Sequence, residues 1–301
     1  MRATVIDMNC VRREDRVIPI MEEAARDQIP ILLPEALLYE GVKGRDWEEG
    51  LRVTLEHVAR FPNRVVAMAR RVHHLVEFES RTGSVIADFA YREQQPRLVG
   101  ILEDIRCGTR ATFDQIRQEN PGAPDAMPRD NDESARTLLL AEIARVQRLL
   151  PAELLNRLRR FPDDDLPASF LAERDRTSEF QSFLQKRGYD PKVSESLALL
   201  PSVTAHEYFA IWALTLWWIS HGGAAAAKAK TFANDLRDLE YVTLGLGCSS
   251  FVTDDGRLAS LYRQLSMTAR LRWTRSTVEL GKTFPDTPPI GIYRTMDHIV
   301  D

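Results

Sequence analysis

The chain has 301 residues, of which 44% are hydrophobic, and its 40 basic and 44 acidic side chains leave a formal charge of −4. This length can bury a full core as one large domain or two modest ones, and the charge excludes a strong overall field that attracts polyanions. Cys10, Cys107 and Cys248 are too few for a disulfide framework and too far apart for a paired zinc site. The first residues lack the regions of a signal peptide, so the sequence predicts a soluble protein of the reducing cytoplasm.

The N-terminal segment alternates strands and helices, as is typical of a parallel sheet. An apolar, β-favouring run over Ala3–Ile6 predicts a buried strand that ends at Asp7 and Asn9. The other expected elements are a helix over Ile20–Asp27, a strand over Ile29–Leu33 and a helix that begins at Pro34 and runs through Glu40. This part of the chain therefore predicts parallel strands whose carboxyl ends lead into polar side chains.

Amphipathic stretches dominate the middle of the chain, where few segments favour a strand. The predicted elements there are helices within Trp47–Phe61 and Ser134–Phe161, an exposed loop over Glu119–Asp132 and a break at Pro162–Asp165. We interpret residues 46–200 as a mostly helical insertion. Residues 1–45 and 201–301 would then form one discontinuous domain.

The α/β pattern returns near the C-terminus. The most apolar stretch, Tyr208–Ile219, has about 12 residues, which is short of the roughly 20 that span a bilayer, so we expect a buried helix. The elements expected after it are a helix over Asn234–Leu246, a strand over Cys248–Thr253 and a helix over Arg257–Met267. We therefore expect the first and last parts of the chain to share one sheet.

Several acidic residues fall where such a sheet would bring them together. Two predicted strands end in acids, at Asp7 and Asp255, and open parallel sheets bind ligands beyond the carboxyl ends of their strands. Glu40 follows the second strand, while Asp235 and Asp238 share one face of a later helix. Clustered carboxylates repel one another unless a cation neutralises them, and hard oxygen ligands suit Mg²⁺ or Mn²⁺. Such ions polarise a phosphodiester and lower the pKa of a bound water, so the pattern favours phosphodiester hydrolysis.

Four segments resemble, in order, the four motifs of PIN-domain ribonucleases: Val5–Asn9, Leu33–Glu40, Asp238–Val242 and Phe251–Leu258. The resemblance covers the two ends of the chain, and the long insertion departs from the compact members of the family. It implies an α/β fold, a three-layer α/β/α sandwich with a central parallel sheet. It also implies an endoribonuclease that binds one or two Mg²⁺ or Mn²⁺ ions.

Carried over residue by residue, the resemblance implies four catalytic acids that also bind the metal: Asp7, Glu40, Asp238 and Asp255. The residues that match the polar supports of the first and last acids are Asn9 and Thr253. Two positions stay open, since Asp235 could replace Asp238 and Asp254 could compete with Asp255.

These acids also have ordinary structural explanations. Asp7 or Asp254 could cap the helix that follows its strand, by accepting a bond from a backbone N–H. Glu40 could be a solvated helix residue. The two aspartates of the later helix could pair on an exposed face with Arg237 or Lys230.

Basic residues near the C-terminus offer a candidate nucleic-acid surface. Arg263, Arg270 and Arg272, accompanied by Trp273, could hold phosphates and stack bases, although a solvated helix face would look the same. Nucleophilic catalysis has little support, because Cys10 has no histidine nearby in the sequence and is explained as a small buried residue.

We therefore predict an endoribonuclease acting on RNA, with DNA left open as a substrate. The non-enzymatic alternative is an inactive PIN-like scaffold that binds a partner protein or RNA through the helical insertion, with homo-oligomer formation also open. A phosphatase of the haloacid dehalogenase type is disfavoured, because it needs an Asp two residues after the first acid, where this chain has Asn9.

Overall fold

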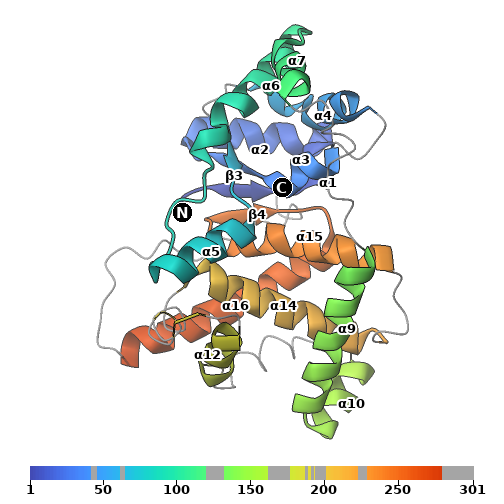
Figure 1. Cartoon of the computed structure of the whole chain (residues 1–301), viewed down its shortest axis with the longest axis vertical. Coiled ribbons are helices and arrows are strands. Elements are labelled where there is room, and N and C mark those ends of the chain that lie inside the picture. Colours follow the sequence, from blue (N-terminus) through green and yellow to red (C-terminus); the bar gives the residue numbers. More distant parts are fainter. Residues whose placement is uncertain are drawn as a thin grey trace, which may run out of the picture.

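The computed structural model describes residues 1–41, 46–61, 65–119, 132–161, 177–186, 189–190, 193, 201–222 and 229–279. Within these ranges the chain folds around one four-stranded sheet that helices cover on both faces (Figure 1). The strands are β1 (Thr4–Ile6), β2 (Ile31–Pro34), β3 (Val66–Ala69) and β4 (Ser250–Val252). The predicted α/β class with a central parallel sheet is confirmed, since every strand pair is parallel.

The order of the strands is β3-β2-β1-β4. Strands β2 and β3 are added on one side of β1 and β4 on the other, so the strand order reverses between β1 and β4. Val5 lies opposite Leu32 on one side and opposite Phe251 on the other. The side chains of β1 and β2 are largely buried because both faces of the sheet are covered, which is why these strands appear as continuous apolar runs in the sequence. The first and last parts of the chain therefore share a sheet, as predicted.

The helices that the structure describes are α1 (Met8–Val11), α2 (Glu14–Asp27), α3 (Glu35–Gly41), α4 (Trp47–Leu55), α5 (Val72–Thr82), α6 (Gln95–Cys107), α7 (Ala111–Glu119), α9 (Asp132–Leu149), α10 (Ala152–Arg160), α12 (Thr177–Lys186), α14 (Val203–Ser220), α15 (Ala229–Leu246) and α16 (Gly256–Glu279). Figure 1 shows α2 on one side of the sheet and α15 on the other, with α14 beyond α15. Helix α2 begins at Glu14 rather than Ile20, and Pro19 lies inside it.

Strand β3 corrects the expectation for the middle of the chain, because it lies within residues 46–200 and forms the edge of the sheet beside β2. Its sequence, Val-Ala-Met-Ala, is short and contains two alanines, which favour helices. A short apolar run of this kind cannot be assigned to a strand or a helix by periodicity alone. Whether the rest of 46–200 is a separate insertion stays a prediction.

The other elements of the middle segment agree with the sequence in part. The stretch Ser134–Phe161 forms two helices, α9 and α10, and Pro151 lies directly before the second. The predicted loop over Glu119–Asp132 and the predicted break at Pro162–Asp165 lie almost wholly outside the described residues. One amphipathic stretch of the sequence therefore forms two separate helices in the structure.

Helix α14 forms the centre of the helical layer beyond the sheet. It contains the apolar stretch Tyr208–Ile219, and nearly all of its side chains are buried, with Trp212 fully enclosed. A helix that is apolar around its whole circumference has to be covered on all sides, here by α15, α9, α10, α5 and α16. In the part of the chain that the structure describes, no helix has the length and apolar character needed to cross a membrane.

Candidate active site

Asp7 directly follows β1 at the carboxyl edge of the sheet. It caps the short helix α1, since its Oδ1 accepts a hydrogen bond from the backbone N–H of Cys10 at 2.9 Å, and its Oδ2 accepts one from the hydroxyl of Thr253. The side chain is only 3% exposed. Burial raises the pKa of Asp7 above its ordinary value, although the bonds from Thr253 and Cys10 favour the charged form. Asp7 is therefore both a helix cap and a buried carboxyl whose charge is not fully compensated.

Asp255 follows β4 at the same edge. The register pairs Ile6 with Val252, and Asp7 therefore lies beside Thr253. The Thr253 hydroxyl donates to Asp7 and accepts the backbone N–H of Asp255 at 3.0 Å, so one side chain connects both acids. Thr253 therefore contacts both acids, and its role as a support for metal-binding acids stays a prediction.

Asp255 is also a helix cap. Its Oδ1 accepts the backbone N–H groups of Arg257 and Leu258 at 2.8 and 3.0 Å, at the start of α16. Asp254, for which a capping role was one of the open explanations, instead turns toward α2. There its carboxylate lies 3.0 Å from Arg13 and 3.5 Å from Arg16. Of the two adjacent acids, Asp255 is therefore the one that faces the site.

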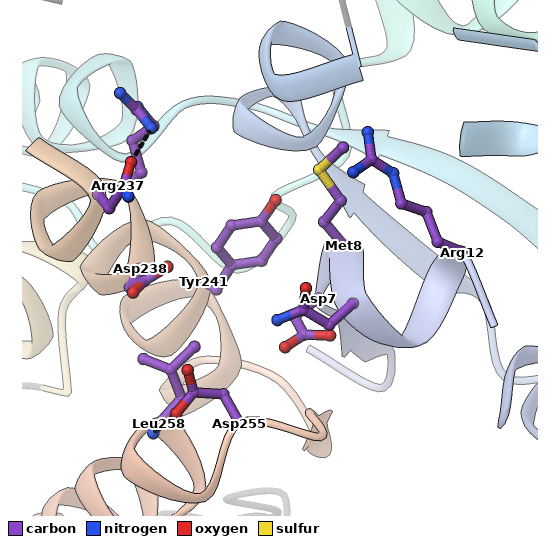
Figure 2. Close-up of a pocket in the computed structure, with 10 residues that line it drawn as sticks. Asp7, Met8, Arg12, Arg237, Asp238, Tyr241, Asp255 and Leu258 are labelled. Atoms are coloured by element: carbon purple, nitrogen blue, oxygen red, sulfur yellow. Dashed lines mark hydrogen bonds between the residues drawn. The ribbon is translucent and has the colours of Figure 1, made fainter. Parts of the chain in front are cut away.

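Three of the four predicted acids line one pocket with a volume of about 360 Å³ (Figure 2). Asp7 and Asp255 come from the ends of adjacent strands, and Asp238 comes from α15. The full lining consists of Asp7, Met8, Asn9, Arg12, Asn234, Arg237, Asp238, Tyr241, Asp255 and Leu258. The pocket lies at the switch in strand order, where open parallel sheets bind their ligands.

The structure separates the two candidates for the third acid. Asp235 is 1% exposed and is not part of the pocket lining. Its Oδ2 accepts the indole N–H of Trp218 at 2.8 Å, and its Oδ1 forms an ion pair with Arg257. Asp238 is 24% exposed at its side chain, lines the pocket, and accepts a bond from Arg257 at 2.7 Å. Asp238 is therefore the acid that faces the pocket, and Asp235 is buried behind it.

Arg257 from α16 bridges Asp235 and Asp238, a partner that was not among the two predicted ones. Arg237 donates to Asn234 at 2.7 Å, and the side chain of Lys230 is not among those described. The pairs are therefore formed between helices and are partly buried, where an exposed face was predicted.

Several predicted residues lie outside the described part of the site. The side chain of Glu40 on α3 is not described, and the same holds for Arg270 and Arg272 on α16. Arg263 on α16 is exposed, and it is not among the residues that line the pocket. The metal-binding role of Glu40 and the nucleic-acid role of the three arginines stay predictions.

The two arginines that line the pocket, Arg12 and Arg237, were not among the residues predicted to bind nucleic acid. Arg12 and Arg237 lie on opposite sides of Tyr241 in Figure 2, and Asn9 is an exposed residue of the same lining. Two nitrogens of Arg12 donate to the hydroxyl of Thr54, at 3.1 and 3.3 Å, which fixes the direction of the guanidinium. The sequence signal that could have identified these two arginines as pocket residues is their position, since Arg12 lies close to Asp7 and Arg237 lies next to Asp238.

Comparison of the chain with protein-family models, curated proteins and solved structures gives no match. Burial raises the pKa of the Cys10 thiol, and the negative charges of Asp7 and Asp254 raise it further, so this buried cysteine stays protonated. The small structural role predicted for Cys10 is thus supported, and a thiolate nucleophile is disfavoured.

The donor set of the pocket suits a hard divalent cation. Among the described residues, no group of three or more His, Cys, Asp or Glu side chains is already gathered for a metal ion. Asp7, Asp238 and Asp255 nevertheless face one pocket, and all three offer carboxylate oxygens. A cation would offset the unfavourable burial of the Asp7 charge. The residues present therefore fit Mg²⁺ or Mn²⁺ in their chemistry.

We expect Asp235 and Asp238 to differ sharply in their contribution to stability. Asp235→Ala should lower the free energy of unfolding by about 2 to 4 kcal/mol, because it removes the buried acceptor of the Trp218 indole and one of the two carboxylates that pair with Arg257. Asp238→Ala should cost about 1 kcal/mol or less, because the pair it removes is partly solvated. Urea unfolding of the two variants without added metal measures this difference. Equal losses would show that Asp238 has the same structural role as Asp235.

Proposed function

We propose that this chain is a PIN-like, metal-dependent endoribonuclease. The observation that carries the proposal is the shared pocket of Asp7, Asp238 and Asp255 at the switch in strand order. Two of these acids are joined through Thr253, so their positions depend on the pairing of β1 with β4. The helices on both faces of the sheet are compatible with the three-layer sandwich that the resemblance implies.

The rim of the pocket supports a nucleic-acid substrate. Arg12 and Arg237 flank the acids and could bind phosphates on either side of the bond to be cleaved. The overall charge of −4 gives no general attraction to a polyanion, so local arginines of this kind would have to supply it. RNA is the proposed substrate class because of the resemblance to ribonucleases.

The acids have separate positioning contacts, and this favours a catalytic arrangement. Asp7 is held by Cys10 and Thr253, Asp255 by the first N–H groups of α16, and Asp238 by Arg257. Asp7, Asp238 and Asp255 would hold Mg²⁺ or Mn²⁺, with Glu40 as a further proposed ligand. The chemistry that such an ion supplies when bound is neutralisation of charge at the scissile phosphate. The fixed carboxylates would orient the substrate relative to that charge.

The proposal is tested with end-labelled single-stranded RNA and a DNA of matched sequence, incubated with the full chain in Mn²⁺, Mg²⁺ or EDTA. We expect internal cleavage of RNA with either metal and none in EDTA. The Asp255→Asn variant should lose this cleavage and stay folded, because Asn is as good a helix cap as Asp. Asp254→Asn is the matched control, since it makes the same change one residue away, outside the pocket lining.

The outcomes of this assay separate the alternatives. Cleavage of DNA alone would keep the metal site and overturn the choice of RNA. Cleavage that persists in EDTA or in Asp255→Asn would contradict the proposed site. A chain that neither cleaves nor binds Mn²⁺ in calorimetry would be the inactive scaffold, with a partner protein or RNA as its ligand.

A further inference from the structure

Arg257 contacts three of the four aspartates that lie in or behind the pocket. Its guanidinium forms an ion pair with Asp235 and donates to Asp238 at 2.7 Å. Its backbone N–H donates to Asp255 at 2.8 Å. The guanidinium carbon also lies 5.1 Å from the centre of the Trp217 ring, which covers the cation from another side. One residue of α16 thus contacts an acid at the end of a strand, Asp255, and two acids on a helix, Asp235 and Asp238.

Arg257 lies among several negatively charged side chains. Burial by itself lowers the pKa of Arg257, but the ion pairs with Asp235 and Asp238 and the charge of Asp255 raise it overall, so the guanidinium is a permanent cation. Burial conversely raises the pKa of Asp235, against the influence of Arg257 and Trp218. Carboxylates gathered in and behind one pocket repel one another, and Arg257 places one fixed positive charge among them.

The bridge divides the acids into two sets. Asp235 has both oxygens engaged by protein groups and does not line the pocket. Asp7 and Asp255 line the pocket, and among the contacts described neither carboxylate is bonded to an arginine side chain. Asp238 both lines the pocket and pairs with Arg257. Two-metal nucleases bring two divalent ions to about 4 Å from each other, with carboxylates shared between them. Here the one carboxylate behind Asp238, that of Asp235, is already paired with an arginine.

We propose that Arg257 takes the place of a second divalent cation, so that the pocket binds one Mn²⁺ or Mg²⁺ ion through Asp7, Asp238 and Asp255. This inference rests on the proposed function. Arg257 is a positioning residue in it: the guanidinium fixes Asp238 through Oδ2 and neutralises Asp235. The number of ions bound therefore depends on the charge at position 257.

Calorimetric titration of the full chain with Mn²⁺ tests this directly. We expect one Mn²⁺ per wild-type chain and two per chain in Arg257→Gln, because removal of the guanidinium frees the charge of Asp235 and Asp238 for a second ion. Arg257→Lys keeps the positive charge and should stay at one ion. Electron paramagnetic resonance of the Mn²⁺-loaded Gln variant should show coupling between two nearby ions, a signal that a purely structural role for Arg257 would not produce.

The possible results separate this inference from the proposed function. A wild-type chain that binds no Mn²⁺ contradicts the metal site itself. A wild-type chain that binds two ions keeps the metal site and overturns the role of Arg257, and this measurement requires no variant to fold. A folded Arg257→Gln protein that still binds one ion also overturns that role. Circular dichroism of both variants establishes that the proteins compared are folded.

Discussion

Replacing Asp7 by Asn should reduce metal-dependent RNA cleavage by at least about 10³-fold, because a ligand that stabilises charge at the phosphate contributes several kcal/mol. The same change should weaken Mn²⁺ binding at least about tenfold, because a neutral amide is a poorer ligand for a hard cation. The fold should be kept, because the Asn oxygen can still accept the N–H of Cys10 and cap α1. Initial cleavage rates and Mn²⁺ titration of the two proteins measure both effects.

The stability of the same variant gives an independent check with a defined dependence on pH. Burial raises the pKa of Asp7 in the folded chain above its value in the unfolded chain. The contribution of Asp7 to the free energy of unfolding is therefore fully present at low pH and is lost as the pH rises through the raised pKa. Asn cannot ionise and does not have this loss. In EDTA, Asp7→Asn should therefore match the wild type in acid and be at least as stable at pH 8. Urea unfolding at both pH values measures the difference, and a variant much less stable than the wild type at pH 8 would contradict this account.

The positions of Asp7 and Asp255 could be predicted from the sequence because two simple rules apply to them. A buried parallel strand produces a short apolar run, and parallel strands end at the same edge of their sheet. The acid that follows each run therefore had to lie at that edge, and the register of β1 with β4 puts Thr253 beside Asp7. The topological switch between these strands supplied the location of the pocket.

The third acid could not be chosen from the sequence. Asp235 and Asp238 are three residues apart and share a helix face, so the spacing treats them alike. What distinguishes them is the indole of Trp218 on α14, which donates to the buried Asp235, while Arg257 on α16 contacts both acids; these contacts form only after three helices have packed together. Pairing between distant elements has no local signal in the chain, and the importance of Arg257 was missed for the same reason.

Buried carboxylates on helices were missed in a similar way. Asp104 on α6 accepts the backbone N–H groups of Ala111, Thr112 and Phe113, and so caps α7. Glu240 on α15 accepts the N–H of Val72 at the start of α5. In the sequence such residues look like solvated helix positions, because the helix end that they cap belongs to another segment. These contacts set the angles between helices without forming a chemical site.

Glu79 on α5 is the extreme case, and Glu79→Ala should lower the free energy of unfolding by about 3 to 5 kcal/mol. Its carboxylate is fully buried and accepts the N–H groups of Ile86, Val203 and Thr204 at 3.2, 3.1 and 2.9 Å, together with the Thr204 hydroxyl at 2.7 Å. Removing it leaves three backbone donors and a hydroxyl without this acceptor, and an unsatisfied buried donor costs about 1 to 3 kcal/mol. Urea unfolding followed by circular dichroism measures the loss.

The control for this change lies on the same helix, where Glu77 is exposed and forms a long, solvated pair with Arg81 at 3.8 Å. Glu77→Ala should leave the unfolding midpoint unchanged. Because α14 also carries Trp217 and Trp218, which contact Arg257 and Asp235, loosening its first turn should alter the tryptophan fluorescence of the folded Glu79→Ala protein. Equal unfolding midpoints for the two variants would contradict this account. They would mean that apolar packing alone stabilises the start of α14, and that water can replace the hydrogen bonds that the Glu79 carboxylate accepts.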